Sequence, residues 1–339
     1  MNWVRKHLFS SRLNSAMTLT VLGLTAWVLP PFLEWAIINA SWTGETRADC
    51  NPDGACWAFI RVRLGQFVFG FYPAAERWRV VLAFLLPVIA AGTLKAAPRI
   101  YALVFTAAIS WILLSGGYFG LEKVETSQWG GLTLTLLFSV VGIASSLPLG
   151  IVLALGRRSS LPFIRSVCVT FIELWRGVPL ITVLFMSSVM LPLFLPEGVN
   201  FNKLLRAMIG IALFSSAYMA EVVRGGLQAI PPGQREAAHA LGMSPLQCTS
   251  LIILPQALRL VIPGIVNTFI GLVKDTSLVM IIGMFDLLGM IQAASADPNW
   301  LGSAIEGYLF AGFCFFVICY NLSQYSQKLE RRLHQARPR

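Results

Sequence analysis

Charged residues are scarce in this sequence. Only 12% of its 339 residues are Asp, Glu, Lys or Arg, whereas 56% are hydrophobic. Soluble globular proteins carry about 25% charged residues, so the composition excludes an ordinary soluble domain. The scarcity of charge instead indicates an integral membrane protein.

Two further absences concern motifs. A phosphate-binding P-loop requires G-x-x-x-x-G-K-[ST], and no lysine in this chain follows a glycine. The first apolar run is about twice as long as the apolar region of a signal peptide, and no convincing A-x-A cleavage site follows it. We therefore expect a retained first span, and no nucleotide site, catalytic residue, metal site or bound cofactor in this chain.

Long apolar runs are plentiful. Five charge-free runs approach or exceed the roughly 20 residues that cross a bilayer as a helix, and they cover residues 13–33, 100–121, 126–156, 177–196 and 307–327. Three shorter or interrupted runs, 80–94, 207–220 and 260–285, are interpreted as helices too, because long side chains at their ends can snorkel. The sequence predicts an all-α membrane protein with about eight transmembrane helices. We expect three of them in an N-terminal part, residues 1–125, and five in a denser core, residues 126–339.

The basic residues mark the ends of the apolar runs. Nucleic-acid binding would need them on one face, so their distribution argues against a nucleic-acid partner and indicates orientation instead. With the N-terminus inside, the inner segments hold 16 of the 26 basic residues, namely Arg5, Lys6, Arg12, Lys95, Arg99, Arg157, Arg158, Arg165, Arg224, Arg235, Arg259, Lys328, Arg331, Arg332, Arg337 and Arg339. The outer segments hold Glu122, Glu125, Glu197, Asp286 and Asp297, although the external loop 39–79 also contains five arginines. We expect both termini on the cytoplasmic side.

The external loop contains two of the six cysteines. Cys50 and Cys56 flank a Pro-Asp-Gly turn in "TRADCNPDGACW", which can bring them together. We expect a disulfide there, and hence an oxidising compartment outside, with two free thiols as the alternative. The remaining cysteines fall in apolar or inner segments, where we interpret them as small hydrophobic residues: Cys168, Cys248, Cys314 and Cys319.

One polar stretch interrupts the hydrophobic core, "PPGQREAAHALGMSPLQCTSLIILPQ" at residues 231–256. Its alanines predict a helix over 234–241, and Gly242 provides a C-terminal stop. The following Ser-Pro-Leu-Gln, at 244–247, has the capping-box pattern of a second helix start. The loop thus predicts a short helix, a sharp turn and another helix on the cytoplasmic side. This is a natural docking element, with a merely solvated connection as the alternative.

The same loop resembles the EAA motif of ABC importer permeases, through Glu236, Ala237, Ala238, Gly242 and the closing "IILP". The segments "AYMAEVVRGGLQAIPPGQREAAHALGMS", "LPQALR" and "KDTSL" resemble the permeases for polar amino acids. The segment "ELWRGVPLITVLF" is similar to these permeases too, with Val178 where threonine is usual. The segments "LFSSRLN", "CWAFIRVRLGQFVFGFYP" and "ERWRV" resemble the longer permease of the general L-amino acid importer of Gram-negative bacteria.

This resemblance implies a fold and a set of partners. The last five helices would form a type I ABC importer permease core, and the loop 225–258 would couple it to an ATPase through Glu236, Ala237, Ala238 and Gly242. The partners would be a second permease chain in a heterodimer, two cytoplasmic ABC ATPase subunits that bind ATP and Mg, and a periplasmic amino-acid-binding protein. The assembly would import L-amino acids across the bacterial inner membrane.

Polar residues in the apolar runs are candidates for the substrate pathway, because an ionisable group costs about 2.5–3.5 kcal/mol at the centre of a membrane helix. Glu173 and Arg176, like Glu221 and Arg224, are three residues apart and can pair on one helix face. Lys274 and Asp275 are neighbours that cannot simply satisfy each other, and they open a polar break in a span. An amino acid carries an ammonium and a carboxylate, so its pathway needs acceptors and donors. The candidates are Glu173, Arg176, Ser215, Ser216, Tyr218, Glu221, Asn267, Lys274, Asp275, Thr276 and Ser277.

Two other classes of protein also fit part of this pattern. A secondary amino acid transporter driven by an ion gradient would use charges within the membrane, but it has no ATPase for the docking loop to contact. A membrane scaffold or receptor would use the charges for packing and the loop for a different partner. The docking loop favours the ATP-driven importer.

Overall fold

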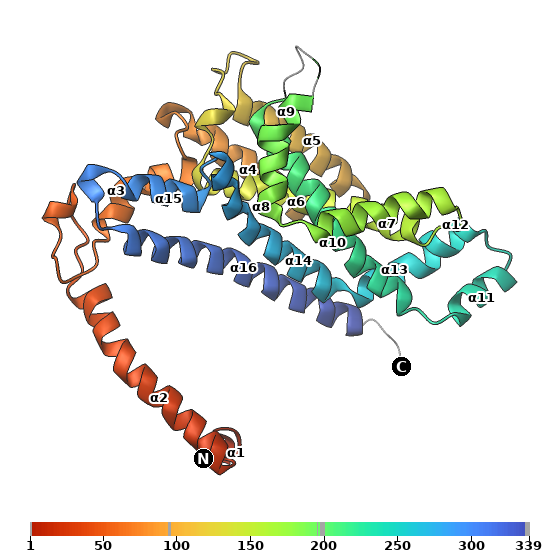
Figure 1. Cartoon of the computed structure of the whole chain (residues 1–339), viewed down its shortest axis with the longest axis horizontal. Coiled ribbons are helices and arrows are strands. Elements are labelled where there is room, and N and C mark those ends of the chain that lie inside the picture. Colours follow the sequence, from red (N-terminus) through yellow and green to blue (C-terminus); the bar gives the residue numbers. More distant parts are fainter. Residues whose placement is uncertain (1, 94–95, 195, 197–200, 336–339) are drawn as a thin grey trace. The chain divides into compact units, whose positions relative to one another are not determined.

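The computed structural model describes residues 2–93, 96–194, 196 and 201–335. In this part of the chain helices dominate and no β-strand occurs, which confirms the all-α prediction (Figure 1). Extended pairing there is limited to isolated bridges, one of which joins Gly131 and Asp286. Some charges of the orientation argument lie outside the described residues: Lys95, Glu197, Arg337 and Arg339.

The chain folds into two compact units. The first comprises Met1–Leu64 and Ile291–Phe310, and the second Gly65–Met290 and Ala311–Arg339. This division differs from the boundary at residue 125 that the sequence predicts, because residues 65–125 belong to the same unit as most of the expected core. The boundaries between the units fall within helices α3 (Ala58–Phe69), α15 (Leu287–Ser295) and α16 (Ala304–Gln335).

The first unit contains most of the external loop. Its other elements are α1 (Asn2–His7), α2 (Arg12–Leu33), the π-helix η1 (Glu34–Ile38) and the 3-10 helices η2 (Arg47–Asp49) and η8 (Pro298–Trp300). Cys50 and Cys56 are joined in a disulfide, with their Cα atoms 5.6 Å apart. The buried carboxylate of Glu306 accepts a hydrogen bond from the Cys56 N–H at 2.8 Å and contacts Arg47 at 3.4 Å. The external loop is therefore an ordered structure and not a free excursion.

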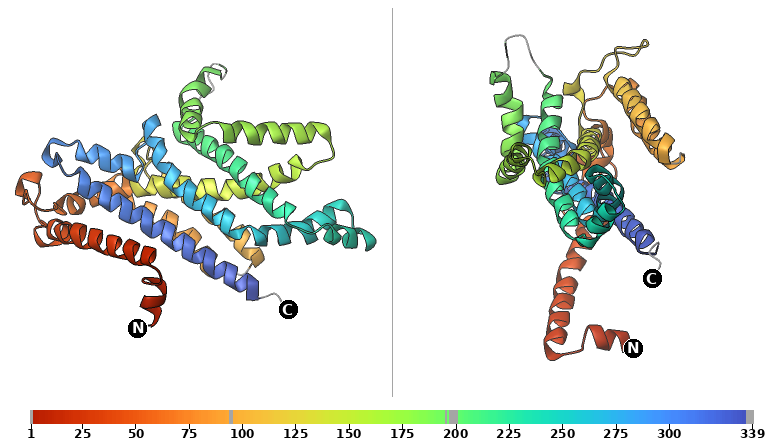
Figure 2. Two further views of the ribbon diagram at one scale, coloured as in Figure 1. Left: turned by 60° about the horizontal axis from the view of Figure 1, so that its bottom comes forward. Right: turned by 90° about the vertical axis from the view of Figure 1, so that its right-hand side faces the viewer.

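The second unit holds the remaining helices. In chain order they are η3 (Ala74–Glu76), α4 (Arg77–Thr93), α5 (Ala96–Ser115), η4 (Thr126–Gln128), α6 (Gly131–Arg157), α7 (Pro162–Gly177), α8 (Leu180–Phe185), η5 (Met186–Met190), α9 (Leu191–Phe194), α10 (Lys203–Gln228), α11 (Gly233–Ala240), α12 (Pro245–Gln247), η6 (Cys248–Ile253), α13 (Leu254–Leu260), α14 (Ile262–Asp275) and η7 (Thr276–Ile282). Helices α6 and α10 lie side by side at its centre (Figure 2). Helices α7, α13 and α14 pack against this pair.

Glycine permits the close contact between the central helices. A Cβ atom on Gly150 of α6 would lie 2.7 Å from Met219 Cγ and 3.1 Å from the Ala220 backbone nitrogen of α10. On α10, a Cβ atom on Gly226 would lie 2.6 Å from the Ala257 carbonyl oxygen of α13. Small residues let helix backbones approach each other where the surrounding lipid provides no hydrophobic driving force. These contacts join α6, α10 and α13 into one packed group.

The number of transmembrane helices is close to the prediction. Among the described residues, five helices are long and apolar enough to cross a membrane: Arg12–Ile38, Gly131–Arg157, Lys203–Gln228, Ile262–Ile282 and Ala304–Arg331. The pair Pro162–Gly177 and Leu180–Phe194 counts as a sixth span only if the two helices are taken together. Helix α4 and the described apolar part of α5, Tyr101–Ser115, are shorter. The predicted eight is therefore an approximate count.

Helix α7 is a feature that the sequence did not predict. It meets the helix of α8 and α9 at 104°, so the span expected over 177–196 begins at a sharp bend. Val178 is extended there, with φ −113° and ψ 136°, because a residue before proline is disfavoured in the helical region. Pro179 also lacks the N–H that a continuous helix would use. The bend places Glu173 and Arg176 on a separate helix that packs against α6 and α10.

A buried carboxylate lies where the N-terminal ends of α6 and α15 meet. Asp286 is fully buried, and its Oδ1 atom accepts a hydrogen bond from the Gly289 N–H at 2.9 Å. The Gly131 N–H donates to the Phe285 carbonyl at 2.9 Å, and the Leu287 N–H donates to Thr135 Oγ1 at 3.1 Å. Burial raises the pKa of Asp286 to about 6, despite the hydrogen bonds that favour its charged form.

The disulfide predicts how the cysteines react. If the protein is denatured without reductant, four of the six cysteines should be alkylated, because Cys50 and Cys56 are bonded to each other. After reduction all six should react, and mass spectrometry of the two samples measures the difference. Alkylation of all six cysteines without reductant would mean that the bond does not form in the membrane.

Asp286 predicts a pH dependence of stability. Its folded pKa of about 6 lies above the reference value of 3.8, so the folded state binds the proton more tightly than the unfolded state. The contribution of this group is fully present below pH 3.8 and is lost as the pH rises through 6. We expect the melting temperature of the wild type, relative to Asp286→Asn in the same detergent, to fall over that range and then stay level. A constant difference across the range would contradict the assignment.

Candidate functional site

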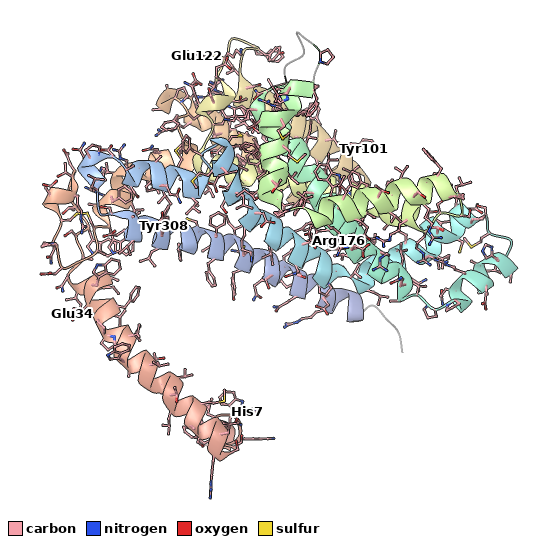
Figure 3. All side chains as sticks on the ribbon, in the orientation of Figure 1. His7, Glu34, Tyr101, Glu122, Arg176 and Tyr308 are labelled. Carbon is pink, nitrogen blue, oxygen red and sulfur yellow. A yellow bond between two sulfur atoms is a disulfide. The ribbon has the colours of Figure 1, made fainter. Side chains whose placement is uncertain are left out.

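Five charged side chains from three helices meet at one end of the second unit. The guanidinium of Arg157, the last residue of α6, donates to Glu173 Oε1 and to Glu221 Oε1, both at 2.9 Å. Arg224 makes a bidentate contact with Glu221, with its Nη2 at 2.8 Å and its Nε at 3.0 Å from Oε2. Arg176, labelled in Figure 3, lies 3.8 Å from Glu221. This group, Arg157, Glu173, Arg176, Glu221 and Arg224, is called the arginine–glutamate cluster below.

Within the cluster, four charged residues that would be costly inside a membrane helix are paired: Glu173, Arg176, Glu221 and Arg224. The predicted pairing within each helix is close for Glu221 and Arg224, at 2.8 Å, and looser for Glu173 and Arg176, at 4.0 Å. Arg157, which the sequence indicated only as an orientation signal, joins the two carboxylates across helices. Because Glu221 has three arginine neighbours, its carboxylate is already engaged before any ligand arrives.

Other candidates on α10 lie near the cluster or inside the helix packing. The ring of Tyr218 lies 5.7 Å from the guanidinium carbon of Arg176, a cation–π distance. Ser216 is fully buried, and its hydroxyl donates to the Leu213 carbonyl of its own helix at 2.8 Å. Ser215 is also buried. The structure thus brings Tyr218 to the cluster, whereas Ser215 and Ser216 lie in the packed interior.

The candidates on α14 and η7 form a separate group. The polar break predicted at 274–277 is a change of helix type, because the α-helix ends at Asp275 and a 3-10 helix begins at Thr276. The hydroxyls of Thr276 and Ser277 each donate at 2.8 Å to a carbonyl of their own helix. Lys274 is exposed and Asp275 half-buried, and neither side chain has a direct hydrogen bond or ion pair within the described ranges. Asn267, also on α14, is exposed.

The polar loop has the structure that the sequence predicts. Helix α11 spans Gly233–Ala240, and Gly242 follows it at φ +76°, the left-handed conformation that favours glycine. Ser244 and Gln247 form the predicted capping box, with N–H to side-chain distances of 2.9 and 3.3 Å. Only Ala238 of α11 is buried, so Glu236 and Ala237 face outward. The loop is a preformed helix and turn with one exposed face.

The loop is held to the helices by packing and by one side-chain hydrogen bond. Ala238 of α11 lies in the same buried cluster as Ala154 of α6, Leu227 of α10 and Ala257 of α13. The side chains of Gln234 and Gln256 are hydrogen bonded at 3.2 Å, which joins α11 to α13.

The ends of α6 and α10 are joined next to the loop. The Arg158 guanidinium, beyond the end of α6, donates to the Leu227 carbonyl near the end of α10 at 2.9 Å. Burial, and then the nearby charge of Arg235, lowers the pKa of Arg158.

Comparison with known proteins identifies this arrangement. Residues 146–335 match the family of binding-protein-dependent transport system inner membrane components. The chain belongs to this family. It is 54% identical to the inner membrane amino-acid ABC transporter permease protein YhdY of Escherichia coli (strain K12), over 99% of this chain and 94% of that relative. The chain is thus a transmembrane permease of an ABC importer, whose ATPase is a separate subunit.

Two further matches support the same family. The permease is 38% identical to the glutamate/glutamine/aspartate/asparagine transport system permease protein BztC of Rhodobacter capsulatus, over 98% of this chain and 93% of that relative. A crystal structure of an amino acid ABC transporter with histidines matches with a TM-score of 0.53 and 31% identity. That match covers 60% of the permease and 92% of the solved chain. The resemblance found in the sequence motifs is confirmed.

The permease also contains charged residues that sequence reasoning missed. Arg157 joins carboxylates that lie 16 and 64 positions away, and no local pattern signals such a contact. Asp286 was counted only as an outer charge, although it is completely buried. The Arg-Arg pair that ends α6 was a usable signal, because two adjacent arginines at the end of an apolar helix mark a place where charge has to be accommodated.

The cluster predicts a difference between its two carboxylates. Glu221→Gln should destabilise the permease by about 2–3 kcal/mol, because its carboxylate is only 16% exposed and three arginines would lose it. Glu173→Gln should cost less than about 1 kcal/mol, because that side chain is 54% exposed. Thermal or denaturant unfolding in detergent measures both. Equal stability of the two variants, with uptake lost only in Glu221→Gln, would instead indicate that Glu221 contacts the substrate.

Proposed function

We propose that this permease is one of two transmembrane chains of an ATP-driven importer that carries L-amino acids across the bacterial inner membrane. Its partners are a second, different permease, two cytoplasmic ABC ATPases that bind ATP and Mg, and a periplasmic binding protein that delivers the amino acid. Both of its termini are cytoplasmic. The observation that carries the proposal is the preformed helix and turn of α11, which packs through Ala238 with residues of the central helices in a chain of this family.

The coupling role is assigned to the exposed face of the loop. Glu236, Ala237 and Gly242 are exposed there, while Ala238 packs into the cluster of buried residues beneath the loop. Leu241 and Leu246, on either side of the turn, are 82% and 78% exposed. Large apolar side chains so exposed on a cytoplasmic loop are expected to be covered by a partner. The ATPase subunit is the partner that the family provides.

The substrate pathway is assigned mainly to the helix change on α14 and η7. Lys274 and Asp275 retain charges without a direct partner in the part of the chain that the structure describes, so they can still pair with a carboxylate and an ammonium. Thr276, Ser277 and Asn267 share this segment, and Ser215, Ser216 and Tyr218 lie on the neighbouring α10. Glu173, Arg176 and Glu221 act as a gate beside the pathway, because their charges are already paired within the arginine–glutamate cluster.

The mechanism follows from the attachment of the loop. ATP binding closes the two ATPases, and each coupling loop moves with the subunit that holds it. Since Ala238 of the loop packs with Ala154 of α6 and Leu227 of α10, movement of the loop tilts the central pair and strains the arginine–glutamate cluster at the same end of these helices. The pathway then opens outward to the loaded binding protein, and hydrolysis restores the inward-facing form.

The direct test is reconstitution of the complete transporter in liposomes with purified binding protein. We expect amino acid uptake that requires ATP hydrolysis inside the liposomes and is insensitive to ionophores that dissipate ion gradients. Uptake driven by an ion gradient without ATP would identify a secondary transporter instead. Absence of uptake, with the partners bound but no transport, would indicate a scaffold or receptor.

The coupling loop predicts an uncoupled variant. Glu236→Arg should leave the permease inserted and folded, because this side chain is exposed, but it should reduce ATP-driven uptake at least about tenfold by reversing a charge at the ATPase contact. The matched control is Glu122→Arg, which changes an exposed glutamate that the proposed topology places on the periplasmic side of the membrane (Figure 3). Copurification of the ATPase and binding-protein-stimulated ATP hydrolysis complete the measurement. Normal uptake in Glu236→Arg would refute the coupling role.

A further inference from the structure

A polar cavity lies at the end of α10 that is remote from the coupling loop. Its volume is about 520 Å³, and it is lined by the start of α10, by η4 and by residues 283–285, which follow η7. Helix α10 has 26 residues, so at 1.5 Å per residue the cavity lies about 39 Å along the helix from the loop. With the loop in the cytoplasm, the cavity opens on the periplasmic side.

The lining carries positive charge without a described counter-ion. Lys203 and Arg206, one turn apart at the start of α10, both contribute to it. Lys203 is exposed and forms no ion pair within the described residues, and its Nζ lies 3.3 Å from the position that a Cβ atom of Gly283 would occupy. A bare glycine at that position therefore leaves room for the ammonium group. The N-terminal end of a long helix adds a partial positive charge at the same place.

Two hydrogen-bond donors at the cavity also lack an acceptor. The Nη1 atom of Arg206 donates to the Ser188 carbonyl at 2.6 Å, but its Nε atom is buried without a hydrogen-bond partner. The indole Nε1 of Trp129, a lining residue that is 2% exposed, is likewise buried without a partner. Buried donors are rarely left unsatisfied in folded proteins. Among the described residues, the lining thus combines two cations without an ion pair and two donors without an acceptor, which suits a ligand that only accepts hydrogen bonds.

Glu125, the one acidic residue among the described residues of the lining, is already paired. Glu125 lies 2.9 Å from Lys123, and both side chains are mostly exposed. Thr126 and Asn202 bond to each other at 2.7 Å, and Asn202 caps α10 by accepting from the Leu204 N–H. These groups shape the cavity but offer no strong acceptor of their own. A ligand with an ammonium group would find no free anion in the described lining.

We propose that this cavity binds a carboxylate side chain, Asp or Glu, on the docking face of the periplasmic binding protein, with Lys203 and Arg206 as the recognition residues. This inference rests on the proposed function, because it requires a binding protein that docks outside. A free amino acid fits less well, because its ammonium would lie beside two cations and have only the paired Glu125 as counter-charge. An acidic side chain brings the carboxylate alone, and the polypeptide that carries it remains outside the cavity.

The test uses the complete transporter in nanodiscs and the purified, amino-acid-loaded binding protein. Lys203→Gln should weaken the affinity of the binding protein about tenfold at low salt, because it removes a charge that has no ion-pair partner among the described residues. The matched control is the double variant Lys123→Gln with Glu125→Gln, which removes two charges that already pair with each other and should change the affinity less than about twofold. Wild-type binding should weaken with ionic strength, and the Lys203→Gln complex should depend less on salt.

Charge reversal makes the test specific. Lys203→Glu should abolish docking, and a binding protein with one docking-face Asp or Glu changed to Lys should restore it. Arg206→Lys keeps the charge but loses the planar group, so docking should be intermediate. At saturating binding protein the maximal ATPase rate of Lys203→Gln should equal that of wild type, because only docking is affected.

Two results would overturn the inference while leaving the proposed function intact. Unchanged affinity in both Lys203 variants at low salt would mean that the cavity has no role in docking. Unchanged docking, together with an altered dependence of uptake on amino acid structure, would assign the cavity to the free amino acid. Failure of the wild-type complex to hydrolyse ATP in response to binding protein would instead contradict the proposed function itself.

Discussion

The packing of α6, α7 and α10 depends on the ion pairs that the guanidinium of Arg157 forms. This guanidinium contacts one carboxylate on α7 and another on α10 at the same distance, 2.9 Å, and so ties three helices together at the end of α6. In a low-dielectric surrounding an unpaired charge is far more costly than a paired one, so these helices cannot separate at this end without exposing an unfavourable charge. The positions of these helix ends are therefore fixed together, and the polar loop begins shortly after α10 ends.

The position of the cluster relates structure to transport. Helix α10 runs from the polar cavity at Lys203 to the loop that begins after Gln228. The proposed docking of the binding protein and the proposed coupling to the ATPase therefore act on opposite ends of one helix. Glycines on α6 and α10 allow the central helices to pack closely. Closely packed helices transmit a displacement at one end to the other end. At the loop end of α10, the arginine–glutamate cluster joins this helix to α6 and α7.

Much of the fold was predictable because the signals are local. The apolar runs identify the long helices, the alanines and glycine of the loop identify α11 and its stop, and Ser244 with Gln247 identifies the next helix start. Some features were missed for equally physical reasons. The bend at Val178 and Pro179 divides an apparently continuous segment, and the amphipathic α7 has no charge-free run to reveal it. The boundary at residue 125 differs from the compact units because contacts between distant residues, such as Cys56 with Glu306, define those units.

By itself the sequence determined the membrane environment, the all-helical class, the helix and turn of the polar loop, and the family, because composition, periodicity, caps and motifs are properties of neighbouring residues. Only the tertiary structure decided which charges meet. Arg157 is far along the chain from Glu221, and the cavity at the start of α10 gathers residues from four separate segments. Spacing along a helix predicts which face a side chain occupies, but not which helix lies opposite it. Packing therefore decides that Glu221 is engaged by arginines, whereas Lys274 and Asp275 have no direct hydrogen bond or ion pair in the part of the chain that the structure describes.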